Sequence, residues 1–197
     1  MQPLSVPGLR QTVAAGLLLR GRTVLRVLWT FSLPARTRHL TRQAMPKHGT
    51  ILLVEHDAND VFLIRKAFED TGVRNPLLVV SSGREAFAYL NGEGKYADRA
   101  ANPFPFLILT DFKMPDGDAF DILRWLAERP QLRKKVIVIV LSSMCSDEEV
   151  GRLYEMGAKS FLLKPTIYRD LVATIRKVKD FWIDSAITPG NSTGPAS

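Results

Sequence analysis

Five short apolar runs alternate with longer amphipathic stretches between residues 51 and 184. The runs have the length of strands, and they lack the polar alternation of strands that face water on one side. They are therefore predicted to be strands of a parallel sheet that is covered on both faces. Their positions are 51–54, 77–80, 106–110, 136–141 and 161–163.

The stretches between the runs carry the signals of helices. In residues 58–70, Val61, Ile64 and Phe68 share one helical face, and Gly72 follows the expected end. Ser82 and Ser146 each precede a glutamate by three residues, the spacing of a capping box, which predicts helices that end near Asn91 and at Gly157. Another helix is predicted over 117–128, where Arg129–Pro130 would stop it. The last helix carries an apolar stripe of Leu171, Val172, Ile175, Val178 and Trp182.

Strands that alternate with helices of this length form right-handed βαβ units. The chain is therefore predicted to be an α/β protein with a five-stranded parallel sheet and helices on both faces. Asp111 closes the third apolar run. Five strands with a candidate active aspartate after the third match the flavodoxin-like strand order 2-1-3-4-5.

Polar groups follow four of the predicted strands. They are Glu55-His56-Asp57 after the first strand, Asp111 after the third, Ser142-Ser143 after the fourth and Lys164 after the fifth. The carboxyl ends of parallel strands meet at one edge of the sheet, where open α/β sheets bind ligands. An aspartate, an acidic cluster, a hydroxyl and a lysine at that edge suit an aspartyl phosphate and a divalent cation.

Four segments in this order resemble the receiver domain of two-component response regulators, over about residues 47–184. They are ILLVEHDAND, ILTDFKMPDGDAFDILRWL, VIVLSSM and FLLKP. The long link after the second helix and the closing Phe181-Trp182 are similar to single-domain regulators that partner bacteriophytochrome-type histidine kinases.

The resemblance implies a role for each residue at the strand ends. Asp111 would be the phosphoacceptor, Lys164 would pair with the phosphoryl oxygens, and Ser142 would hydrogen-bond the bound phosphate. Phe161 would be an aromatic switch that turns inward when Ser142 moves. Receiver domains usually also have a cis peptide bond after the lysine, here Lys164–Pro165, which would aim the ammonium at the site.

The resemblance also implies a Mg²⁺ site, formed by Glu55, Asp111 and the backbone carbonyl of Lys113. The family normally has two carboxylates after the first strand, whereas this chain has Glu55 followed by His56. Mg²⁺ prefers oxygen to imidazole, so His56 is either a tolerated variant or the cause of a disabled metal site. Asp57 could reach the metal, but its direction differs by one residue.

Composition separates the two ends of the chain from its centre. Seven of the 27 basic residues lie in residues 1–44, which hold no acidic residue, so from residue 45 onward the remaining 20 basic side chains balance 20 acidic ones. This balance does not indicate a nucleic-acid surface. Residues 1–44 are expected to be a basic leader that is disordered or not translated, with a targeting or membrane-surface role as the other hypothesis. The polar tail 185–197 is expected to be disordered.

Location follows from two further observations. The longest apolar run of the leader, 13–19, is too short to span a bilayer. The single Cys145 excludes an internal disulfide, which fits a reducing cytoplasm. A cytoplasmic protein with no membrane span is expected.

Together these features predict a single-domain response regulator rather than an enzyme. It would take a phosphoryl group from a sensor histidine kinase and signal through protein contacts, with no DNA-binding domain after residue 184. The helix at 146–157, the strand at 161–163 and the last helix would form the output face, which could support a homodimer. Tyr154 and Tyr168 could anchor a partner there or belong to the core.

Three other functions were weighed. A phosphatase of the haloacid dehalogenase type would need an aspartate where this chain has Lys113. A flavodoxin-type flavin binder would need a phosphate loop after the first strand, where Glu55 and Asp57 would repel a phosphate. The remaining alternative is a pseudo-receiver that binds a partner without phosphorylation because His56 weakens the Mg²⁺ site.

Overall fold

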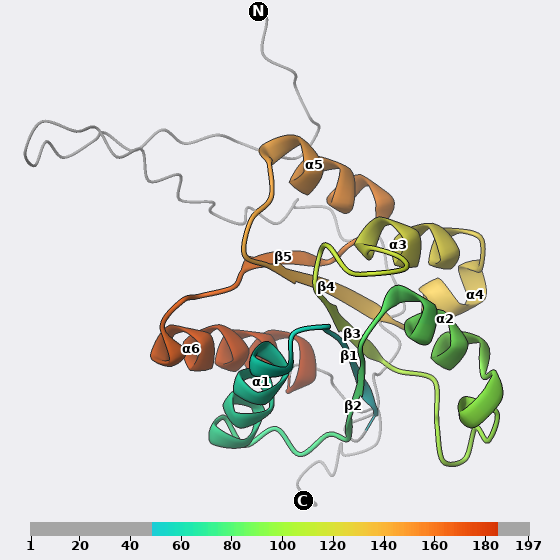
Figure 1. The fold of residues 1–197 in the computed structure, drawn as a ribbon, viewed down its shortest axis with the longest axis horizontal. Coiled ribbons are helices and arrows are strands. Elements are labelled where there is room, and N and C mark those ends of the chain that lie inside the picture. Colours follow the sequence, from blue (N-terminus) through green and yellow to red (C-terminus); the bar gives the residue numbers. More distant parts are fainter. Residues whose placement is uncertain (1–48, 185–197) are drawn as a thin grey trace, which may run out of the picture. The chain divides into compact units, whose positions relative to one another are not determined.

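The five predicted strands form one parallel sheet in the computed structural model, which describes residues 49–184 (Figure 1). The strands are β1 (Ile51–Val54), β2 (Leu77–Val80), β3 (Leu107–Thr110), β4 (Ile137–Ser142) and β5 (Ser160–Leu163). They lie in the order β2-β1-β3-β4-β5, which confirms the predicted flavodoxin-like topology. The predictions on residues 1–44 and 185–197 lie outside the described range.

Helices cover both faces of this sheet. On one face α1 (Ala58–Asp70) packs beside α6 (Tyr168–Val178), and the other face carries α2 (Gly83–Asn91), α3 (Ala119–Ala127) and α5 (Asp147–Met156) (Figure 1). Shorter helical segments are η1 (Gly94–Tyr96), α4 (Pro130–Arg133) and η2 (Lys179–Ile183). No helix within residues 49–184 is both long and apolar enough to cross a membrane.

Alternate residues of the central strands enter two separate cores. In β1, Leu52 and Val54 pack under α2, α3 and α5, whereas Ile51 and Leu53 pack under α1 and α6. All four side chains are buried because each face of the sheet is covered. This double burial is why the strands read as continuous apolar runs in the sequence.

Side-chain caps fix where the helices begin. Ser146 and Glu149 form the predicted capping box of α5, with Ser146 accepting from the Glu149 N–H and Glu149 accepting from the Ser146 N–H. The helix predicted from residue 117 begins two residues later. Asp118 and Asp121 form a capping box of their own, and this cap sets the start of α3 at Ala119.

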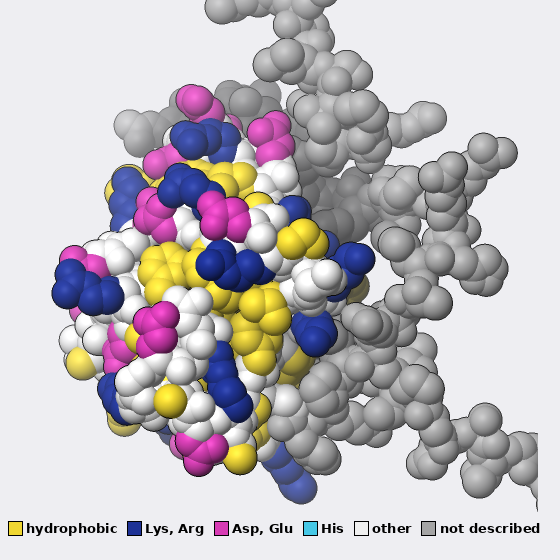
Figure 2. Space-filling model, turned by 90° about the vertical axis from the view of Figure 1, so that its right-hand side faces the viewer, with side chains coloured by type: hydrophobic (Ala, Val, Ile, Leu, Met, Phe, Trp, Pro, Cys, Tyr) yellow, Lys and Arg dark blue, Asp and Glu magenta, His cyan; other side chains and the backbone are white. Residues whose placement is uncertain are grey.

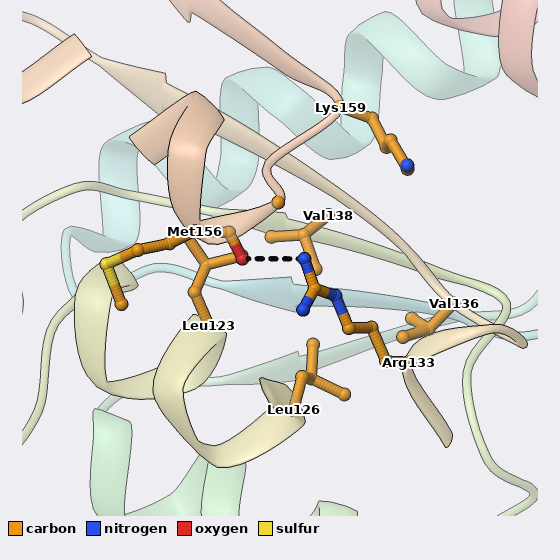
Figure 3. A pocket seen from close by; sticks show the side chains of 8 residues that line it. Leu123, Leu126, Arg133, Val136, Val138, Met156 and Lys159 are labelled. Carbon is orange, nitrogen blue, oxygen red and sulfur yellow. Dashed lines mark hydrogen bonds between the residues drawn. The ribbon is translucent and has the colours of Figure 1, made fainter. Parts of the chain in front are cut away.

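Pro130 does more than end a helix. The structure has a further helical turn here, α4. Proline is well suited to the first position of a helix, because the N–H group that it lacks would have no partner within the helix. Arg133 of this turn donates to the carbonyl of Met156 at the end of α5 over 3.2 Å. Figure 3 shows this bond across a small hollow of about 30 Å³ that is lined by α3, β4 and α5.

The long link after α2 folds back onto the end of that helix. The guanidinium of Arg99 donates to the carbonyls of Tyr89 and Leu90, over 2.7 and 2.6 Å. These carbonyls lie in the last turn of α2, where intrahelical donors run out. The Tyr89 carbonyl also accepts from the N–H of Gly92, over 3.1 Å. The link therefore stabilises the helix end.

The start of α2 packs against the loop that follows Asp111. The N–H of Gly83 donates to the carbonyl of Pro115, over 3.1 Å. A Cβ atom at residue 83 would lie only 2.4 Å from the carbonyl oxygen of Gly117, so this backbone contact requires glycine. The contact holds the loop beside the candidate site.

Candidate phosphorylation site

Asp111 lies at the carboxyl edge of the sheet, between β1 and β4. Its backbone N–H donates to the carbonyl of Val54, over 2.9 Å, so the pairing of β1 with β3 fixes its position. One carboxylate oxygen, Oδ1, accepts from the N–H of Phe112 over 2.6 Å, and Oδ2 accepts from Lys164 over 3.0 Å. The side chain is 12% exposed, so incoming groups can still reach it.

Lys164 connects three carboxylates at the centre of the site. Its Nζ atom donates to Glu55 Oε2 over 2.5 Å, to Asp60 Oδ2 over 2.8 Å and to Asp111 Oδ2 over 3.0 Å. Burial by itself would lower the pKa of this ammonium, but the hydrogen bonds to the three carboxylates outweigh burial and raise the pKa. Lys164 is therefore a permanent cation next to Asp111.

The predicted cis bond at Lys164–Pro165 is wrong for this structure. No peptide bond in residues 49–184 is cis. The backbone N–H of Lys164 donates to the carbonyl of Ser142, over 2.8 Å, and the side chain reaches all three carboxylates from a trans peptide.

Glu55, His56 and Asp111 form a group that could hold a metal ion. One potential ligand atom from each lies within 4.8 Å of the others. Glu55 is 1% exposed and its Oε1 accepts from the N–H of Asp57 over 2.9 Å, whereas the His56 side chain is 47% exposed. Two carboxylates and an imidazole suit a divalent cation, and the imidazole distinguishes this set from one made of oxygen ligands alone.

Asp57 serves the helix beside the site. Its Oδ1 accepts from the N–H groups of Asn59 and Asp60, over 2.7 and 3.1 Å, which makes it the N-cap of α1. These two hydrogen bonds lower the pKa of its carboxyl. Asp57 is not part of the group of potential metal ligands that the structure brings together.

Sequence reasoning missed Asp60. It lies in the first turn of α1, and its carboxylate accepts a hydrogen bond from Lys164, which is 104 residues further along the chain. A signal was available, because the first turn of a helix that follows a parallel strand faces the crevice at the sheet edge. The spacing from the capping Asp57 places Asp60 in that turn.

Ser142 and Phe161 border the site rather than contact Asp111. Ser142 is buried, and its hydroxyl donates to the carbonyl of Met144 over 3.1 Å. Phe161 is half-buried against the α2–α3–α5 core, and its N–H donates to the hydroxyl of Tyr154 on α5 over 3.1 Å. Phe161 therefore joins β5 to α5, whereas Ser142 bonds within the loop that precedes α5.

The side chains of Lys113 and Cys145 both interact with Glu149 of α5, and the role of the Lys113 backbone carbonyl as a metal ligand stays a prediction. The Lys113 ammonium lies 3.9 Å from a carboxylate oxygen of Glu149 on α5, and its side chain is largely exposed. The thiol of Cys145 is half-buried, and burial followed by the charge of Glu149 raises its pKa to about 11. A thiol with such a pKa is a poor nucleophile at neutral pH.

Comparison with known proteins decides the family. The model of the response regulator receiver domain matches residues 51–176. The chain belongs to this family. Its phosphoacceptor candidate, lysine and acidic cluster lie at the strand ends of the receiver fold, as the resemblance implied.

Two response regulators, Rcp1 and RcpA, are similar to this chain in sequence or in structure. Response regulator Rcp1 of Synechocystis is 28% identical over 139 residues, which cover 71% of this chain and 92% of that protein. The crystal structure of the phosphorylated cyanobacterial phytochrome response regulator RcpA has a TM-score of 0.65 at 30% identity, covering 73% of this chain and 99% of that one. The Mn²⁺-bound form of Rcp1 has a TM-score of 0.63 at 27% identity, covering 72% and 99%.

Proposed function

We propose that this response regulator accepts a phosphoryl group on Asp111 from a sensor histidine kinase. The observation that carries the proposal is the Lys164 ammonium, 3.0 Å from Asp111 Oδ2, in a site that also holds the acidic pair Glu55 and Asp111. The phosphorylated state in the structure of RcpA, to which this chain is similar, supports it. A cytoplasmic location, where such a kinase would present its phosphohistidine, is part of the proposal.

The carboxylate of Asp111 is the nucleophile. Carboxylates stay ionised at neutral pH, so no general base is needed. An oxygen of Asp111 bonds to phosphorus while the phosphorus–nitrogen bond of the phosphohistidine breaks, and the imidazole leaves with the electron pair of that bond. The product is an acyl phosphate on Asp111 and a free kinase histidine.

Lys164 changes partners in this step. Its ammonium is shared among three carboxylates before transfer, and afterwards it can bind a phosphoryl oxygen in place of one of them. A divalent cation held by Glu55, His56 and Asp111 would neutralise further charge on the phosphoryl group. The Mn²⁺-bound form of Rcp1 supports such a cation in this family.

The signal would leave through the surface formed by α5, β5 and α6. Ser142 would turn toward the phosphoryl group, and Phe161 would follow it inward. Exposed apolar side chains gather on this stretch of the chain, where Met144, Tyr154, Leu163 and Ile167 are all more than 40% exposed. Such side chains are typical anchors for a protein partner, which includes a second copy of this chain.

Labelling with a small phosphodonor tests the proposal. The full-length protein with acetyl phosphate and a divalent cation should form an acyl phosphate that hydroxylamine cleaves, and Asp111→Asn should abolish it. Asp116→Asn, on the exposed part of the same loop, is the matched control and should be labelled like the wild type. Label that survives Asp111→Asn would place the chemistry elsewhere. A protein that takes no label yet still binds its kinase would be the pseudo-receiver.

A further inference from the structure

His56 gives this metal site a ligand set that differs from two-carboxylate receivers. Its imidazole belongs to the same group of potential ligands as Glu55 and Asp111, with one atom of each within 4.8 Å of the others. The His56 side chain is 47% exposed, and its Nδ1 atom lies 3.5 Å from Oε1 of the buried Glu55. The site thus offers one nitrogen donor beside carboxylate oxygens.

The two carboxylates of this group are already shared with other donors. Glu55 Oε2 and Asp111 Oδ2 both bind Lys164, and Glu55 Oε1 accepts from the N–H of Asp57. The ammonium reduces the negative charge that a cation would meet. A hard ion such as Mg²⁺ depends on that charge and on oxygen ligands. A borderline ion also gains from bonding to an imidazole nitrogen.

We propose that His56 makes this site selective for a borderline transition ion, such as Co²⁺ or Zn²⁺, in place of Mg²⁺. The proposal rests on the proposed function, in that it takes the site at Asp111 as the metal-dependent site of phosphorylation. It assigns His56 as a direct ligand of the metal. His56 is then a determinant of which ion supports signalling.

The ratio of affinities is the informative quantity, because N- and O-donor sites in general bind Co²⁺ more tightly than Mg²⁺. Calorimetric titration of the full-length protein with Mg²⁺, Mn²⁺ and Co²⁺ alone gives this ratio for the wild type and for His56→Asp. Residues that merely support a ligand change metal affinity by about 10- to 100-fold, so replacing a direct ligand should lower the preference for Co²⁺ over Mg²⁺ by at least about tenfold. His56→Gln provides a second variant with an oxygen ligand and no added charge.

A background variant lacks the other imidazoles and the thiol of the chain, which could also bind a transition ion. His39, His48 and Cys145 are the remaining imidazoles and the thiol of the sequence, so all titrations are repeated with His39→Gln, His48→Gln and Cys145→Ser combined. Asp111→Asn in this background should weaken the binding of every ion, which places the binding at the site.

Electron spin-echo spectroscopy of bound Mn²⁺ reports the ligand directly. The background protein should show modulation from a directly bound ¹⁴N nucleus, and both His56 variants should lose it. An unchanged Co²⁺-to-Mg²⁺ preference in His56→Asp, or no ¹⁴N modulation with His56 present, would overturn the proposal.

Phosphorylation is scored separately with each ion at saturation. If Asp111 is labelled while no ¹⁴N modulation is seen, the assignment of His56 fails and the proposed function stands. If ¹⁴N modulation is seen while no ion supports labelling, the proposed function fails and the assignment of His56 stands.

Discussion

At the scale of single residues, the site is organised by competition for one ammonium. Lys164 binds Glu55, Asp60 and Asp111 at once, and its own side chain is only 10% exposed. A buried cation with three carboxylate partners is well compensated, but an incoming phosphoryl group must displace one of them. Asp60 is the most exposed of the three, at 37%, and is the partner that gives way most easily.

Asp60→Asn should therefore accelerate phosphorylation. The substitution removes one competitor for Lys164 and one negative charge that repels the anionic donor. We expect the rate of labelling by acetyl phosphate to rise about two- to fivefold, since partly exposed ion pairs are worth roughly 0.2–1 kcal/mol. Glu69→Gln, the same change of charge at the far end of α1, serves as the control. A slower rate in Asp60→Asn would mean that Asp60 positions Lys164 for the transfer.

Glu85 should make folding stability depend on pH in the acid range. Its hydrogen bond with Lys95, together with one from the N–H of Ser81, lowers the pKa of its carboxyl from 4.5 to about 2. A depressed pKa means that this stabilisation is complete above about pH 4.5 and is lost as the pH falls toward 2. The Tm of Glu85→Gln should lie below that of the wild type at pH 7, and the two should converge near pH 2. Glu155→Gln, on the exposed side of α5, should show no such convergence.

At the scale of elements, α5 and β5 are joined by hydrogen bonds that can transmit a change at Asp111. Tyr154 of α5 accepts from the N–H of Phe161, and its ring is 42% exposed. Of the two roles predicted for Tyr168, partner anchor or core residue, its contacts favour the core. It is half-buried, and its hydroxyl donates to Asp70 of α1 over 2.8 Å, so it belongs to the packing of α1 with α6.

Beryllofluoride, a mimic of the phosphoryl group, should change how this face associates. We expect it to stabilise self-association or partner docking by about 1–3 kcal/mol, or roughly 5- to 150-fold in affinity, as is usual for allosteric coupling. Sedimentation measures self-association, and pull-down with and without the mimic covers other partners. Ser142→Ala should reduce the response, because the hydroxyl is the proposed sensor. A face that does not respond to the mimic would favour the pseudo-receiver.

At the scale of the whole molecule, two hydrophobic cores pack against opposite faces of one sheet. A substitution in a central strand should therefore disturb the packing on both faces. Leu109 of β3 is fully buried under α1 and α6, whereas Leu163 of β5 is 62% exposed. Leu109→Ala should lower the free energy of unfolding by about 2–5 kcal/mol. Leu163→Ala, the same truncation in an edge strand, should change it by less than about 0.5 kcal/mol. Denaturant unfolding of both variants checks the contrast.

A shallow groove of about 430 Å³ lies on another part of the molecule. Its walls include Leu90 and Trp125, near the carboxyl ends of α2 and α3, and Leu132 of α4. Figure 2 shows apolar side chains gathered on the face that carries these helices, with Lys and Arg around them. Gly83, at the amino end of α2, contacts the loop that follows Asp111, whereas the groove lies near the carboxyl end of α2, so it is separate from the candidate site.

The sequence by itself predicted the five strands, the five longer helices and the sheet edge that carries the candidate site. Apolar runs that lack alternation have one explanation in a chain of this length, a sheet buried on both faces, and caps such as Ser146 act within one helical turn. Polar residues after strands β1, β3, β4 and β5 were enough to place Asp111, Glu55 and Lys164 together. These signals are local or follow from topology alone.

Only the tertiary structure decided how those groups divide their contacts. Asp60 and Lys164 are 104 residues apart, and the sequence could place both near the sheet edge but could not show that they bind each other. Asp57 could have faced the metal or the helix, and the unpaired N–H groups at the start of α1 drew its carboxylate to the helix. Such choices depend on distances of a few ångström between segments that the strand order brings together, and hydrogen bonds form or fail over those distances.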